Sequence, residues 1–240
     1  MTSLLPLHLP RAVSKPEVIF RNYSVTALGA DGAPCVADFD APALPLFDSA
    51  FTAFAHGTQF TGLNGTVSIE DLEPGDWLHT STGKPAQVTW IGSANFIPAD
   101  TGRRTRLIRI MADSFGPNRP GSFVTVGPAA RILHRPRHLP ATSEQDKMLT
   151  PVETLVDNVN VIEITPPTPV RLFHICLSRH AAVDVGGLMM GAYHPGTAVL
   201  DGVPDKHRAQ FLSMFPNLGQ MTDFDPLAHP RITQDSLAAE

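Results

Sequence analysis

The chain has 240 residues, of which 42% are hydrophobic, and this length and composition are typical of one folded domain with added segments. Its formal net charge of -5 at pH 7 argues against a nucleic-acid-binding protein, because such proteins carry clustered positive charge. Its 18 glycines and 23 prolines interrupt helices, which excludes a helical bundle and favours a β protein rich in turns.

Neither the cysteines nor the first residues indicate a secreted or membrane protein. The two cysteines, Cys35 and Cys176, are too few for a disulfide framework or for a zinc site made of cysteines alone. Residues 1–10 lack the basic segment of a secretory signal, and no stretch reaches the roughly 18 apolar residues of a membrane-spanning helix. We therefore expect a cytoplasmic protein that binds neither nucleic acid nor membrane, although a non-standard export signal would escape this reasoning.

The first half of the chain alternates short strand-like segments with turn signals. Val18–Leu28 is rich in β-branched and aromatic residues and ends before a cluster of glycine, aspartate and proline. A connector rich in proline and alanine follows, and it leads to residues 47–54. The remaining elements predicted here are a hairpin turn at Gly62–Gly65, a strand at Thr66–Leu72 that runs into one helical turn, a turn at Glu73–Asp76, and strands at Trp77–Thr80 and Ala86–Ile91.

The second half contains further predicted strands and two short helices. One helix, Val152–Val156, follows a capping box formed by Thr150 and Glu153. The other, Lys206–Phe215, follows a capping Asp205 and presents Ala209, Leu212 and Phe215 on one face. The strands predicted in this half are Thr105–Met111, Ser122–Val126, Val159–Ile164 and Val170–Leu177. We expect an N-terminal extension with strands at residues 1–46, a β domain at 47–196, and a C-terminal tail with one short helix at 197–240.

Several motifs together resemble a Hint (hedgehog/intein) domain, in particular its bacterial branch. A Gly-Thr pair at residues 57–58 precedes a strand and the sequence Glu-Asp-Leu-Glu-Pro-Gly-Asp at residues 70–76. The resemblance continues through residues 88–92, 108–116, 173–180 and 211–216, and so runs from about Phe47 to the C-terminus. It implies a compact, mostly β fold with short helices and a C-terminal helical tail.

The resemblance also implies a reaction whose side chains are missing from this chain. In the family a cysteine attacks the preceding carbonyl, and a Thr-x-x-His or Ser-x-x-His element protonates the scissile peptide. The nucleophile position falls on Ala53, which has no heteroatom, and the Thr-x-x-His positions fall on Gly127 and Ala130. Where inteins end in His-Asn, this chain has His194 and Pro195 and then continues. We therefore expect a catalytically degenerate Hint-domain protein that acts as a structural or protein-interaction module and needs no cofactor or metal.

The alternative is an autoprocessing enzyme that uses shifted residues. Thr52 and Thr58 flank the vacant position with hydroxyl groups, and His56 is close in sequence, although a strand hydroxyl bonded to backbone is the simpler interpretation. His174 and Cys176 lie two apart on a predicted strand, with His180 four residues further on. They could form a zinc site or a Cys–His pair, but the spacing fits no standard zinc pattern, and a buried cysteine in a β core is the common outcome.

The remaining charged and aromatic residues have simpler interpretations. The segment Arg131–His138 holds three arginines and two histidines, and it is either a solvated loop or an anion-binding site. Glu70, Glu73 and Asp76 lie around a Pro-Gly-Asp turn, where capping is expected of them rather than catalysis. Two further positions, Trp77 and Trp90, alternate with polar neighbours and are predicted to be core residues.

Overall fold

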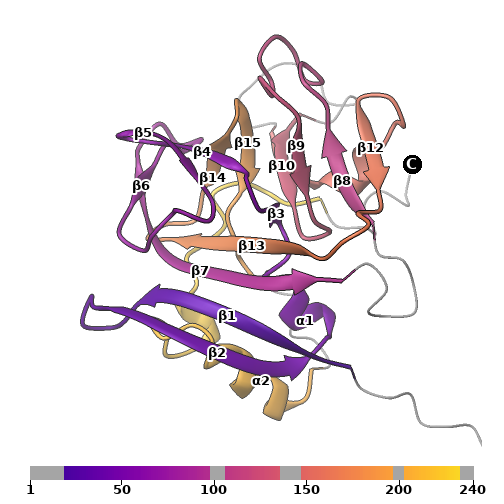
Figure 1. Cartoon of the computed structure of the whole chain (residues 1–240). Coiled ribbons are helices and arrows are strands. Elements are labelled where there is room, and N and C mark those ends of the chain that lie inside the picture. Colours follow the sequence, from indigo (N-terminus) through magenta and orange to yellow (C-terminus); the bar gives the residue numbers. More distant parts are fainter. Residues whose placement is uncertain (1–18, 98–105, 136–146, 197–202, 233–240) are drawn as a thin grey trace, which may run out of the picture.

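The computed structural model describes residues 19–97, 106–135, 147–196 and 203–232, and these form the mostly β protein that the sequence predicts (Figure 1). Fifteen strands in these ranges pair antiparallel in one hydrogen-bonded network, in the order β11-β10-β15-β14-β4-β6-β7-β13-β3-β9-β8-β12. Beside this path, β1 pairs with β7, β2 with β1, and β5 with β4. The strands are β1 (Phe20–Leu28), β2 (Pro34–Pro42), β3 (Phe54–Ala55), β4 (Gln59–Gly62), β5 (Gly65–Ser68), β6 (Trp77–Leu78), β7 (Ala86–Phe96), β8 (Leu107–Ile110), β9 (Val124–Val126), β10 (Arg131–His134), β11 (Met148–Pro151), β12 (Val161–Ile164), β13 (Val170–Leu177), β14 (Ala182–Val185) and β15 (Leu188–Gly191).

Helices are few and short in the described part of the chain. They are α1 (Pro45–Asp48), α2 (Asp205–Leu212) and the single-turn 3-10 helices η2 (Val152–Leu155) and η4 (Met221–Asp223). None of these helices is long and apolar enough to cross a membrane. The strands therefore build most of the molecule, and α1 and α2 pack on one side of β7 and β13.

The long strand β7 lies between β13 on one edge and β1 on the other. Figure 1 shows the β1–β2 hairpin, α1 and α2 on one side of β7 and β13, with most other strands on the opposite side. The backbone of β7 is tightly covered at Gly92, where an added Cβ would overlap the Trp90 ring and lie 2.6 Å from Phe51. Only glycine fits this position without displacing both rings.

Two large hydrophobic clusters lie on β7 and β13. The larger one joins β3, β4, β9, β13 and β14 through buried side chains such as Phe54, Phe60 and Ile175. The second cluster, which we call the terminal core, combines both ends of the described chain with the middle of β7 and β13. Its buried members are Tyr23, Val25, Ala27, Ala41, Leu46, Phe47, Ala50, Phe51, Trp90, Ala94, Cys176, Tyr193, Phe211, Met214 and Phe215.

Trp90 is the centre of the terminal core. Its indole Nε1 donates a 2.6 Å hydrogen bond to the carbonyl of Met214, and its ring stacks on Phe215 with centroids 4.6 Å apart. On its other side the ring meets Phe51 edge-on at 5.3 Å. Because a buried indole N–H needs an acceptor, this bond fixes the C-terminal segment against β7.

Most predicted strands are present, and β13 has the predicted bounds. The hairpin turn at Gly62–Gly65 joins β4 to β5, and Gly75 in the turn at 73–76 has a φ of 114°. Trp90 is fully buried as predicted, but the prediction for Trp77 is wrong, since it is 47% exposed at the start of the two-residue strand β6.

Both predicted helix caps are wrong. Thr150 belongs to strand β11, and its hydroxyl donates to the carbonyl of Met148, so the 3-10 helix that follows begins after Pro151 without a side-chain cap. Pro204 occupies the capping position of α2, which places Asp205 inside the first turn. There its carboxylate still interacts favourably with the positive end of the helix dipole. The face predicted for this helix also differs, because Phe211, Met214 and Phe215 are the buried residues.

The segment 131–138 is not the predicted loop over its first half. Arg131–His134 form strand β10, which pairs with β11 and contacts β15 at Met190. Residues 136–138 lie outside the described residues. Strands β2, β11, β14 and β15 are further elements that the sequence did not indicate.

The terminal core predicts a large effect for Phe211→Ala. Phe211 is fully buried and contacts the rings of Phe47 and Phe215, so truncation should lower the free energy of unfolding by about 3–5 kcal/mol in urea denaturation. Phe20→Ala is the control, since Phe20 is 63% exposed, and its cost should stay within about 0.5 kcal/mol. Equal effects of the two variants would show that the terminal core does not stabilise the protein.

Candidate functional site

Ala53, which the motif spacing predicts at the family's nucleophile position, lies fully buried between α1 and β3. Its N–H donates to the carbonyl of Phe173 on β13 at 2.9 Å, and its carbonyl accepts the N–H of Gly127 at 2.8 Å. The preceding carbonyl, that of Thr52, accepts the N–H of Ala129 at 3.1 Å. The peptide bond between residues 52 and 53 is therefore held by hydrogen bonds on both sides.

Gly127 allows this close approach because it has no side chain. An ideal Cβ at this position would overlap the Thr52 carbonyl oxygen, lie 3.0 Å from the Thr52 carbonyl carbon and lie 2.9 Å from the Leu172 side chain. The backbone of residue 52 thus occupies the space that a threonine or serine side chain at position 127 would need. Ala130 is buried three residues later and contributes a methyl group to the wall of a cavity.

The hydroxyl groups around Ala53 are bonded to nearby backbone carbonyls. Thr52 Oγ1 donates to Asp48 at 2.7 Å, Thr58 Oγ1 donates to Ala55 at 2.6 Å, and Ser49 Oγ donates to Leu46 at 3.1 Å. Each hydroxyl proton is therefore donated to a backbone carbonyl three or four residues earlier in the chain, and not to a side chain that could act as a base.

His56 lies away from this position. Its side chain is 61% exposed, and its Nδ1 lies 3.6 Å from a carboxylate oxygen of Glu70. The other oxygen of Glu70 accepts the N–H of Gly57, and Asp76 accepts the N–H of Glu73. These acidic residues hold turns together, as expected from the Pro-Gly-Asp motif.

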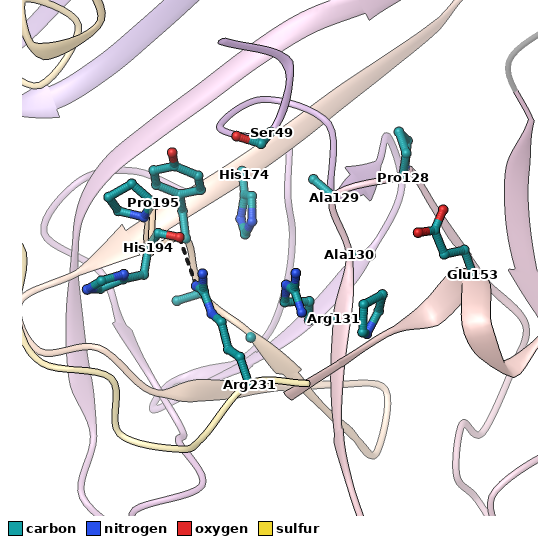
Figure 2. Close-up of a pocket in the computed structure, with 14 residues that line it drawn as sticks. Ser49, Pro128, Ala129, Ala130, Arg131, Glu153, His174, His194, Pro195 and Arg231 are labelled. Atoms are coloured by element: carbon teal, nitrogen blue, oxygen red, sulfur yellow. Dashed lines mark hydrogen bonds between the residues drawn. The ribbon is translucent and has the colours of Figure 1, made fainter. Parts of the chain in front are cut away.

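A cavity of about 200 Å³ opens beside residues 129–130 (Figure 2). Its walls come from the α1–β3 connection, the turn before β10, β13, the segment after β15, and the C-terminal segment. Figure 2 shows the guanidinium groups of Arg131 and Arg231 side by side, with the ring of His174 above the gap between them. The residues that line the cavity are Ser49, Pro128, Ala129, Ala130, Arg131, Pro151, Glu153, His174, Gly191, Ala192, Tyr193, His194, Pro195 and Arg231.

His174 is held neutral in this cavity. Burial, together with the nearby charges of Arg231 and Arg131, lowers its pKa to about 3. Its Nδ1 accepts the N–H of Ile175 at 3.1 Å, so the neutral ring carries its proton on Nε2. The ring is thus a hydrogen-bond donor on the side away from that bond, and it is also packed edge-on against Phe54 and Tyr193.

Cys176 and His180 do not form a reactive group with His174. Burial raises the pKa of the Cys176 thiol, which lies in the terminal core and stays protonated. The pKa of His180 is lowered to about 3 by burial, and its Nδ1 accepts the N–H of Ala228 at 3.1 Å. Cys35, half-buried on β2, is also a free thiol. Within the described ranges, no group of three or more histidine, cysteine, aspartate or glutamate side chains could hold a metal ion.

The two arginines of the cavity were not recognised as a pair from the sequence. Arg131 lies at the start of β10, and Arg231 is brought beside it by an isolated parallel bridge to Leu149 on β11. A second contact fixes the same segment, since Ser81 Oγ and His229 Nε2 are 2.7 Å apart. Only the tertiary pairing of the C-terminal segment brings these positions together.

Comparison with known proteins identifies the family. A family model described as the Hint domain matches residues 52–197, which is more than half of the chain. The chain belongs to the Hint domain family. The match begins one residue before Ala53 and includes β3 to β15, so the Hint domain contains Gly127, Ala130 and His174.

Solved structures of low identity are also similar. A bacterial intein-like domain from Clostridium thermocellum has 12% identity and a TM-score of 0.39, with 60% of this chain and 99% of that domain covered. The MchDnaB-1 intein has 11% identity and a TM-score of 0.37, with 59% of this chain and all of that intein covered. Among curated proteins, none matches this chain.

The close approach at residue 127 predicts that Gly127→Ala destabilises the protein. The new methyl group must displace the backbone of residue 52, which should cost about 1–3 kcal/mol in urea denaturation. Gly121→Ala is the matched control, because the nearest atom to a Cβ there is 4.0 Å away. A Gly127→Ala variant as stable as Gly121→Ala would contradict the close approach.

The buried histidines predict that stability falls in mild acid. The unfolded chain protonates each imidazole near its ordinary pKa of 6.5, whereas folded His174 and His180 resist protonation down to about pH 3. Between these values the unfolded state binds more protons, so the free energy of unfolding decreases as the pH falls. At pH 5 each histidine should account for a loss of about 2 kcal/mol relative to pH 7.

His174→Gln tests this prediction by removing one of the two groups. The difference in unfolding free energy between pH 7 and pH 5 should shrink by about 2 kcal/mol, measured by urea denaturation at both pH values. His79→Gln is the control, since His79 is exposed, and it should leave the difference unchanged. An unchanged difference in His174→Gln would mean that the histidine is protonated in the folded state.

Proposed function

We propose that this Hint-domain protein has lost autoprocessing and acts as a structural or protein-interaction module. The observation that carries the proposal is the packing of the Thr52 carbonyl against Gly127. In the family's reaction that carbonyl is attacked, and the side chain of residue 127 would assist. Here the space for that side chain is filled by the carbonyl itself, so restoring a threonine would require the backbone to move.

The surrounding groups support the same proposal. The side chain at position 53 is a methyl group, which cannot attack a carbonyl. The nearby hydroxyls donate to backbone carbonyls, and the Cys176 thiol is buried with a raised pKa. His174 is neutral and already accepts a backbone N–H through Nδ1. The alternative is an autoprocessing enzyme that uses shifted residues. Such an enzyme would require one of these side chains to give up its present hydrogen bond or buried position.

An interaction role is supported by apolar side chains left in solvent. Leu63 and Trp77 are 48% and 47% exposed, and their backbones are joined by a hydrogen bond from Leu63 N–H to the Trp77 carbonyl. Tryptophan is enriched at protein-binding surfaces, so the exposed Trp77 supports an interaction role. We also propose that the segments before residue 47 and after residue 196 belong to the same folding unit as the Hint domain, because the terminal core contains all three parts.

Intact mass spectrometry tests the loss of autoprocessing. The purified chain, incubated with dithiothreitol or hydroxylamine at pH 7, should keep its full mass of 25.9 kDa. Ala53→Cys should also remain intact, because it supplies the thiol without the acid or the space at position 127. Fragments cut between residues 52 and 53 in the unmodified chain would overturn the proposal. Cleavage of Ala53→Cys alone would show that the remaining site is still competent.

A further inference from the structure

The cavity beside Ala130 holds two positive charges from distant parts of the chain. Arg131 donates through one terminal nitrogen to the carbonyls of Ile232 at 3.1 Å and Leu149 at 3.4 Å. Arg231 donates through one terminal nitrogen to the carbonyl of His194 at 2.8 Å. A guanidinium carries five N–H donors, so these bonds fix each group in place and use only part of its capacity.

One of the remaining donors is buried without an acceptor. Within the described residues, Arg231 Nε is shielded from solvent and has no hydrogen-bond partner. Leaving a charged donor unpaired in the interior is costly, so the structure holds Arg231 in the cavity wall at a cost in stability. The second guanidinium lies beside it, which adds a like charge to the same small space (Figure 2).

The charges that face the cavity do not balance. Arg131 and Arg231 are positive, and Glu153 is the acidic residue on the described wall. Burial lowers the pKa of Arg131, and the charge of Glu153 opposes this shift only in part. Burial lowers the pKa of His174 and His194 and raises that of Tyr193, so all three are neutral at pH 7. The described lining therefore carries one excess positive charge, and burial together with Arg131 lowers the pKa of Arg231 to about 10.

The donors converge from different directions. The two guanidiniums approach from β10 and from the C-terminal segment, and the His174 ring approaches from β13 on the opposite side (Figure 2). A planar carboxylate matches one guanidinium fork, whereas the oxygens of a tetrahedral anion point in several directions and can be shared between donors. A volume of about 200 Å³ leaves room for such an anion.

We propose that the cavity between Arg131, Arg231 and His174 binds a phosphate-type oxyanion, either free phosphate or the phosphate group of a small monoester. Arg131 and Arg231 bind its oxygens through charge-assisted hydrogen bonds, and the neutral His174 donates from Nε2. The anion offsets the excess positive charge of the lining. This site does not depend on the loss of autoprocessing, since the arginines and the cavity are present in either case.

Calorimetric titration of the full chain with inorganic phosphate at pH 7 tests the proposal, in a buffer without oxyanions and at constant ionic strength. Phosphate should bind saturably with one site per chain, sulfate should compete with it, and acetate or chloride should not. Absence of saturable phosphate binding, or equal binding of acetate, would overturn the proposal. Tighter binding of glycerol 3-phosphate than of phosphate would identify a monoester as the ligand, and weaker binding would identify the free ion.

Three variants locate the site. Arg131→Gln and Arg231→Gln should each weaken phosphate binding by about tenfold or more, because each removes charge-assisted hydrogen bonds. Arg179→Gln is the matched control, since this arginine is exposed, and it should bind phosphate like the unmodified chain. Unchanged phosphate binding in both Arg131→Gln and Arg231→Gln would contradict the assignment of the binding site to this cavity.

Ala129→Leu keeps both arginines and partly fills the cavity. It therefore tests whether phosphate binding needs the space of the cavity, independently of the positive charges. It should weaken phosphate binding while the circular dichroism spectrum stays that of the unmodified chain. If an arginine variant fails to fold, this variant and the titration of the unmodified chain still decide the question. Full phosphate binding by folded Ala129→Leu would exclude the cavity as the binding site.

Discussion

The hydrogen bonds between residues 52–53 and residues 127–129 set the geometry of the region around Ala53. They join the end of the N-terminal segment to the turn between β9 and β10, and the bond from Ala53 to Phe173 joins both to β13. The turn can come this close only because Gly127 lacks a side chain. The positions of Ala130 and Arg131 follow directly, since they are the next residues along the chain.

The terminal core packs the strands outside the family match against the Hint domain. The β1–β2 hairpin extends the sheet through β1 and β7, while α2 and the residues after it cover Trp90. Gln210 of α2 also donates to the backbone carbonyl of Asp40 on β2. One face of β7 and β13 is thus buried by residues from both ends of the described chain, which leaves the cavity on the side of Ala130 accessible.

The sequence predicted those parts of the fold that depend on local signals. The hairpin at Gly62–Gly65, the turn at Gly75 and strand β13 rest on turn residues and β-branched runs that act over a few positions. Strand β2 was missed because it has proline at both ends and two aspartates, a composition tolerated only where a strand has one neighbour. The buried face of α2 was misjudged because the helix ends at Leu212, and Met214 and Phe215 reach the core from beyond it.

The sequence predicted only those parts of the candidate site that depend on local motifs, and it missed those that depend on tertiary contacts. Motif spacing singled out positions 53, 127 and 130, and the structure brings residues 53 and 127 together through a backbone hydrogen bond. The pairing of Arg131 with Arg231 is decided by one bridge between Leu149 and the C-terminal segment, and no local signal reports such a contact. Trp77 shows the opposite error, in which alternation along a strand was taken as burial although the strand has only two residues.

The terminal core also has a consequence for the order in which the newly made chain can fold. Tyr23 and Phe51 are synthesised before Trp90, whereas Met214, which accepts the hydrogen bond of the indole, is synthesised 124 residues after it, and Phe215 follows Met214. Until then one face of β7 and β13 remains an open apolar surface on the nascent chain, a state prone to association with other chains. Completion of this layer therefore waits for the synthesis of α2 and the residues after it, however early the rest of the Hint domain folds.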